Sequence, residues 1–208
     1  ETPWVLDAQD EAQQRQRLGL LFDLSHMGQQ LQTARKQLLE RQLDDGSFSW
    51  MPDGRSDRYI TQHLVAGFGH LDALGVSNFK TDLIWYKALM RAIDYLDQTL
   101  QTEYLQLTAR AKQTDHPANY LAQNHLNPPM IHYLYARSFF KDYPIKENHQ
   151  TAFKYYTQQA AQHWNQSTRH LQALLALALH RLGEDQSTPQ KIVRAARENA
   201  LQSEALGM

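Results

Sequence analysis

The chain has 208 residues, 42% of them hydrophobic and 10% aromatic, which is enough for one domain with a buried core. Its net charge of -1 gives no electrostatic reason to expect a nucleic acid or an anionic membrane surface as partner. It contains no cysteine, which excludes disulfides, zinc sites built on thiolates and a cysteine nucleophile within these residues.

The chain begins at Glu1 rather than Met, so we expect it to be a segment of a longer protein. The sequence contains no run of about 18 apolar residues, the length that a helix needs to span a bilayer. Glycine and proline are few, 9 and 7 residues, which favours long helices over strands. We therefore expect a single all-α domain over residues 1–208.

Apolar residues recur at helical spacing in eight segments of the chain. The segments at Met130 and Leu171 are apolar nearly all the way round, which predicts inner helices covered by neighbours. The segment at Trp85 is amphipathic and predicts an outer helix. In chain order the eight segments are Asp10–Leu24, Met27–Leu43, Tyr59–Leu74, Trp85–Leu100, Met130–Phe140, Thr151–Trp164, Leu171–Leu182 and a last helix that begins at Ser187.

Inner and outer segments alternate along the second half, and the inner ones recur at a spacing of about 40 residues, which is typical of helical-hairpin repeats. Such an array closes into an α/α toroid or stays open as a solenoid. Eight helices are too few for a closed ring. We therefore expect an incomplete α/α toroid of about eight helices in inner and outer layers, with the most buried residues on the helices at Tyr59, Met130 and Leu171.

Two glycines, Gly67 and Gly69, lie in the middle of the Tyr59–Leu74 segment. Each costs on the order of 1 kcal/mol of helix stability relative to alanine. Their presence predicts that another helix packs closely against this one.

The loop from Gln42 to Asp57 reads QLDDGSFSWMPDGRSD. Gln42, Gly46 and Phe48 form a Gln-x-x-x-Gly-x-aromatic pattern similar to the glutamine–tryptophan motif of terpene-cyclase-type toroids. Gly46 would allow a tight turn, the glutamine amide would satisfy terminal backbone groups, and we expect Phe48 and Trp50 both to be buried. The alternative is an ordinary Asp-Gly turn followed by core aromatic residues.

Longer stretches extend this similarity. Gly46–Val76, GSFSWMPDGRSDRYITQHLVAGFGHLDALGV, resembles the part of bacterial alpha-2-macroglobulins in which a DGG-F-x-W loop leads into a YITQ-x-x-x-x-G-x-GHL helix. Asn124–Phe140 (NHLNPPMIHYLYARSFF) and Thr2–Asp23 are similar to further stretches of the same proteins. The rest of the chain fits only as generic toroid helices.

The resemblance implies a place in the thioester domain of an endopeptidase inhibitor of the cell envelope, periplasmic or membrane-anchored. In that family a Cys-x-Glu-Gln sequence forms a thioester that acylates an attacking protease, and it lies on the N-terminal side of the region that begins near Trp4. This chain has no cysteine, so no catalytic residue is carried over. The implied partners are proteases trapped by the whole protein and neighbouring domains of the same chain, with no cofactor, no nucleic acid and no membrane contact by these residues.

Two further groups of residues, the histidines and the loop acids, could carry chemistry. His63 and His70 are seven residues apart, as are His125 and His132, whereas two metal ligands on one helix usually lie three or four apart, so these histidines indicate structure rather than a metal site.

The loop acids Asp45, Asp53 and Asp57 could supply the two carboxylates of a glycosidase, with Trp50 stacking on a sugar. Acids also flank turns for backbone reasons. Arg55 and Arg58 would then form local ion pairs with them.

These observations favour a non-enzymatic structural module of a broad-range protease trap, whose loop residues Gln42, Gly46, Phe48 and Trp50 hold the fold. A carbohydrate-active α/α-toroid enzyme is the first alternative. A helical-repeat module that binds proteins is the second.

Overall fold

The computed structural model describes residues 25–75, 81–183 and 186–200. The chain divides into two compact units, Glu1–Gln42 and Leu43–Met208. In the first unit, residues 25–39 are helical and present Met27 and Leu31 as exposed apolar side chains. The helix expected over Asp10–Leu24 lies outside the described residues.

The second unit is all-helical in its described residues, apart from one isolated antiparallel bridge between Phe48 and Asp57. None of the helices in these residues is long and apolar enough to cross a membrane. In chain order the elements are α2 (Arg58–Ala73), α3 (Leu83–Ala111), α4 (Pro117–Ala122), α5 (Pro128–Arg137), the 3-10 turn η1 (Ser138–Phe140), α6 (Glu147–His163), the 3-10 turn η2 (Trp164–Gln166), α7 (Arg169–Leu182) and α8 (Ser187–Glu198).

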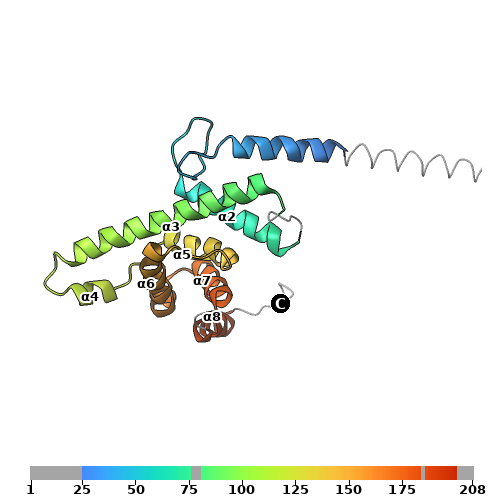
Figure 1. Cartoon of the computed structure of the whole chain (residues 1–208). Helices are drawn as coiled ribbons and strands as arrows, with labels where there is room; N and C mark the ends of the chain where they lie inside the picture. Colours follow the sequence, from blue (N-terminus) through green and yellow to red (C-terminus); the bar gives the residue numbers. More distant parts are fainter. Residues whose placement is uncertain (1–24, 76–80, 184–185, 201–208) are drawn as a thin grey trace, which may run out of the picture. The chain divides into compact units, whose positions relative to one another are not determined.

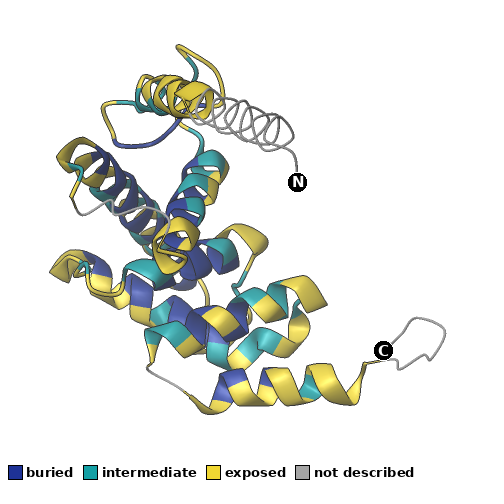
Figure 2. Cartoon of the chain, turned by 90° about the vertical axis from the view of Figure 1, so that its right-hand side faces the viewer, coloured by how far each residue is buried: buried dark blue, intermediate teal, exposed yellow. Residues whose placement is uncertain are grey.

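The helices pack in two rows (Figure 1). Helix α5 lies between α2 and α7 and contacts both, while α3 and α6 pack against each other and against the first row. Helix α8 packs on α7, and α4 packs on α3. The core lies where the rows meet, and Figure 2 shows buried residues on the helix faces that point toward one another. Helix α5 is the most enclosed, since every residue from Tyr133 to Arg137 is buried.

Helix α3 is longer than expected, because it continues past Leu100 to Ala111. Leu107 and Ala111 prolong its apolar stripe and are both buried. The helix also contains Ile93, which is fully buried. We expected the most buried residues on the helices at Tyr59, Met130 and Leu171 alone. This expectation is wrong in part, because one face of α3 is also fully buried in the core.

The two glycines of α2 have different surroundings. A Cβ at Gly69 would lie 2.3 Å from Cγ of Phe139, so the predicted close packing is confirmed there. A Cβ at Gly67 would meet nothing within 4 Å, so the same prediction is wrong for Gly67. One glycine faces the packed side of α2, and the other faces open space.

Helix α5 begins where local sequence favours it. The Asn127 side chain accepts a hydrogen bond from the N–H of Met130 at 2.9 Å, and Pro128 and Pro129 occupy the first helical positions, where a missing N–H costs nothing. The short helix α4, which the apolar pattern did not predict, likewise opens with a proline, Pro117.

Candidate functional site

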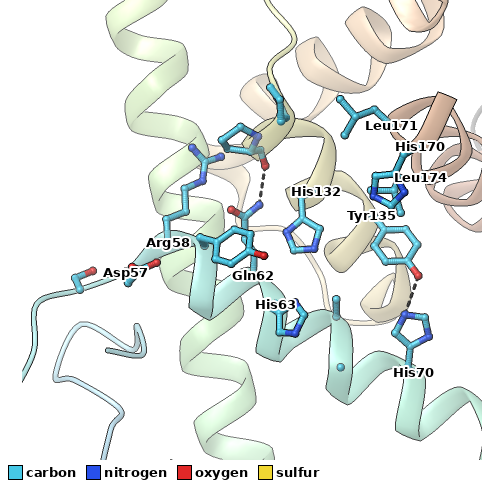
Figure 3. Close-up of a pocket in the computed structure, with 16 residues that line it drawn as sticks. Asp57, Arg58, Gln62, His63, His70, His132, Tyr135, His170, Leu171 and Leu174 are labelled. Atoms are coloured by element: carbon cyan, nitrogen blue, oxygen red, sulfur yellow. Dashed lines mark hydrogen bonds between the residues drawn. The ribbon is translucent and has the colours of Figure 1, made fainter. Parts of the chain in front are cut away.

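A pocket of about 1000 Å³ lies between α2, α5 and α7, at the upper end of the volumes usual for ligand sites (Figure 3). We call it the histidine groove. Each of its three helices contributes at least one imidazole: His63 and His70 from α2, His132 from α5 and His170 from α7. Its apolar walls include Ala66, Gly67, Pro129, Leu171 and Leu174.

His132 lies among aromatic rings in the groove. Its ring centroid is 6.1 Å from that of Tyr59, 6.5 Å from that of His63 and 6.4 Å from that of Tyr135, all in stacked orientations. Burial lowers the pKa of His132, and the neighbouring charges of His63 and His170 lower it further. Within the described residues its buried Nδ1 has no hydrogen-bond partner. His132 is thus a neutral side chain with one unused polar atom.

Two hydrogen bonds fasten α2 to α5 along the groove. The Gln62 amide donates from Nε2 to the carbonyl oxygen of Pro129 at 2.7 Å, and Tyr135 Oη lies 2.8 Å from His70 Nε2. Both are visible as dashed lines in Figure 3. Gln62 is itself buried, so its contact holds the two helices at a fixed separation.

The charged residues at the groove's end have partners outside the groove, although in the described residues Nε and Nη2 of Arg58 are buried without a hydrogen bond. The carboxylate of Asp57 caps α2 by accepting from the N–H of Ile60 at 3.0 Å. Arg58 pairs through Nη1 with Glu103 of α3 rather than with the loop acids, so the ion pairing expected between Arg58 and those acids is wrong. The longer reach of α3 explains this, since it brings Glu103 beside the start of α2.

The loop predicted as a structural motif is held against α3. Gly46 has a φ of +90°, and a Cβ there would lie 2.3 Å from the carbonyl oxygen of Arg91. The Arg91 guanidinium donates to the carbonyl oxygens of Leu43 and Asp44, both at 2.9 Å. Gln42 is the last residue of the first unit, and its N–H donates to the carbonyl oxygen of Leu39 at 3.1 Å.

The two aromatic residues of the loop have opposite environments. Phe48 is 1% exposed, and its N–H donates to Thr61 Oγ1 at 2.8 Å. Trp50 is 63% exposed, so the prediction that it is buried is wrong. The Ser49 hydroxyl and the N–H of Gly54 both donate to the carbonyl oxygen of Met51, which closes a turn directly after Trp50. Trp50 thus lies beside an exposed turn and outside the core.

The three loop acids serve backbone geometry. Asp45 accepts from both the N–H and the hydroxyl of Ser47, and these hydrogen bonds outweigh burial and lower its pKa. Asp53 adopts a positive φ of 56° within its turn. Asp57 caps α2, as described above. Asp45 and Asp57 border different pockets, the latter the histidine groove.

The two histidine pairs singled out in the sequence differ in whether their members share a site. His63 and His70 both line the groove, but His125 does not accompany His132, because its Nε2 lies 2.7 Å from the carbonyl oxygen of Tyr120. In the part of the chain that the structure describes, no three His, Asp or Glu side chains are arranged to hold a metal ion. Sequence spacing gave no signal for the groove, because its imidazoles come from three separate helices.

Comparison with known proteins does not extend the resemblance noted in the sequence: no protein-family model, no curated protein and no solved structure matches this chain.

Proposed function

We propose that the chain is a non-enzymatic helical module of an alpha-2-macroglobulin-like protease trap, and that it acts by holding other polypeptide segments in place. One observation carries this proposal. The sequence stretches Gly46–Val76 and Asn124–Phe140, which bear the resemblance, supply α2 and α5, and these helices pack together and form two walls of the histidine groove. Segments far apart in the chain thus make one local structure.

The packing of the helices supports the toroid element of the proposal. In an incomplete α/α toroid, inner helices contact inner ones and outer helices contact outer ones. The row α2, α5 and α7 would be the inner layer, and α3 with α6 the outer layer. This division follows the alternation of strongly apolar and amphipathic segments in the sequence.

The test compares the chain with a longer protein that contains it. We expect the whole protein to inhibit trypsin, and its gene to encode a Cys-x-Glu-Gln motif or further inhibitor domains before Glu1. The 208-residue chain, which has no cysteine to form an acyl donor, should leave trypsin activity unchanged and give no higher-mass band on a denaturing gel.

A covalent adduct with the chain alone would contradict the proposal, as would a complete parent protein without any effect on proteases. The groove also fits the helical-repeat alternative, in which the module binds proteins outside any trap. Hydrolysis of a glycan substrate by the chain would instead favour the carbohydrate-active alternative, and Asp45, Asp53 and Asp57 would be the residues to substitute first.

A further inference from the structure

The histidine groove combines apolar walls with a one-sided set of titratable groups. The titratable residues that line it from the three helices are bases and phenols. Asp57 is the one carboxylate among the groove's lining residues, and it caps the N-terminus of α2. Around the groove these groups are Arg58, Tyr59, His63 and His70 on α2, His132 and Tyr135 on α5, His170 and Arg181 on α7, and Glu103 of α3, which is paired with Arg58.

We propose that the histidine groove binds a short polypeptide segment that carries both acidic and large apolar side chains, and that it binds this segment more tightly as pH falls from neutral. The proposal rests on the proposed function as a module that holds polypeptide segments, and it names the chemistry of its occupant.

Charge complementarity selects an acidic occupant. A carboxylate that enters the groove meets imidazoles from three helices, together with the Arg58 guanidinium at its end. Protonated imidazole would pair with the carboxylate through a charge-assisted hydrogen bond, whereas a cationic segment would be repelled. Leu171 and Leu174 of α7 and Ala66 of α2 provide the apolar surface against which the apolar side chains of the segment would pack.

The direction of the pH dependence follows from linkage. Burial, with the charges of His63 and His170, lowers the pKa of His132 in the free protein, so this residue is neutral at pH 7. A bound carboxylate favours the protonated form of a nearby histidine. Binding is therefore coupled to proton uptake, and the affinity rises as the pH falls from neutral toward the lowered pKa of His132.

Gly67 offers a variant that blocks the groove without disturbing the fold. A Cβ at this position meets nothing within 4 Å, and Gly67 lines the groove, so the side chain of Gly67→Leu would extend into the binding space. Leucine also has a higher helix propensity than glycine, so this variant should fold at least as well as the unmodified chain.

The experiment measures fluorescence polarisation of a fluorescein-labelled peptide of alternating leucine and glutamate, titrated with the full chain at pH 7.5 and pH 6.0. We expect roughly threefold or greater tightening at the lower pH, as for a partly exposed ion pair. The same peptide with glutamine in place of each glutamate should bind more weakly and show no such tightening. Gly67→Leu should abolish binding, and His132→Gln should remove most of the pH dependence.

The matched control is His116→Gln, which changes an exposed histidine that precedes α4, away from the groove. It should leave both affinity and pH dependence unaltered. Equal binding of the glutamate and glutamine peptides would overturn the proposal, as would unchanged binding by Gly67→Leu. None of these outcomes bears on trypsin inhibition by the whole protein, so failure here is distinguishable from failure of the proposed function.

Discussion

Helix α5 carries two polar clusters that differ in how completely they are paired. On the side facing α3, the Tyr133 hydroxyl donates to Asp97 at 2.6 Å and the Arg137 Nε donates to the same carboxylate at 3.2 Å. Arg137 also donates to the carbonyl oxygens of Phe140 and Tyr143. On the side facing the groove, His132 has a buried Nδ1 without a hydrogen-bond partner in the described residues.

The difference separates a structural cluster from a candidate binding cluster. Burial and the charge of Asp97 raise the pKa of Tyr133, which keeps its hydroxyl protonated as a donor. Asp97, Tyr133 and Arg137 are all buried, and their side chains are hydrogen-bonded to one another and to backbone carbonyl oxygens. His132, by contrast, lines the groove and keeps one buried polar atom without a partner in the described residues. Substitutions on each side of α5 should therefore differ in their effects.

The largest effect in either polar cluster is expected for Arg137→Met. This change leaves the Asp97 carboxylate buried without its cation, and removing one partner of a buried pair typically costs about 3–5 kcal/mol. Urea denaturation should give a free energy of unfolding lower by that amount. Adding Asp97→Asn to the variant should recover part of the loss. A change below about 1 kcal/mol for Arg137→Met alone would mean that the pair contributes like an exposed one.

A smaller effect, of opposite sign at two neighbouring positions, is expected for the glycines of α2. Gly69→Ala places a methyl group against the Phe139 ring and should destabilise the fold by about 1–3 kcal/mol. Gly67→Ala points into the groove and should stabilise it by up to about 1 kcal/mol. Thermal unfolding of both variants checks this. Equal shifts at the two positions would show that they share one environment.

A pH-dependent effect is expected for His132. Its pKa is lowered in the folded state, so on acidification below about pH 6.5 the unfolded chain takes up a proton that the folded chain resists, and stability is lost as pH falls. His132→Gln should therefore reduce the fall in melting temperature between pH 7 and pH 5. The same change at His116 should not. A steeper fall of the melting temperature in the His132 variant would contradict the conclusion that the folded protein favours neutral His132.

The smallest effect is expected for Trp50→Ala. Because this side chain is 63% exposed, its removal should change the free energy of unfolding by about 0.5 kcal/mol or less. Phe48→Ala, two residues earlier in the same loop, should cost about 3–5 kcal/mol. A glycan-binding screen of the unmodified chain belongs beside this measurement, since specific binding that Trp50→Ala abolishes would support the carbohydrate-active alternative.

The sequence predicted the helical class and most helices because apolar periodicity is a local property, as at Trp85, where the amphipathic stripe begins. It placed the end of α3 too early because the polar residues Gln101, Thr102 and Glu103 follow Leu100, although Leu107 and Ala111 prolong the stripe. Residues 117–122 were missed since a helix of one or two turns has too few positions for a periodic pattern.

The loop and the groove depend on contacts between distant segments. The large apolar side chains of Phe48 and Trp50 suggested that both are buried, but Trp50 directly precedes the turn at Met51 and is exposed. Gly67 and Gly69 look alike in the sequence, and only the position of Phe139 tells them apart. His132 and His170 are separated by a full helical hairpin, so no spacing rule brings them to one site.

Helix α3 has a consequence for how the second unit unfolds. Its 29 residues span about 43 Å at 1.5 Å per residue, and it contacts α2, α4, α5 and α6. A helix shared by so many neighbours cannot melt while they stay folded, so backbone amides in its middle should exchange with deuterated solvent only through global opening. Amides in its last turns, where α4 is the neighbour, should exchange through local fraying. Within α3, the middle would thus open only when the whole unit unfolds, whereas the last turns would open locally.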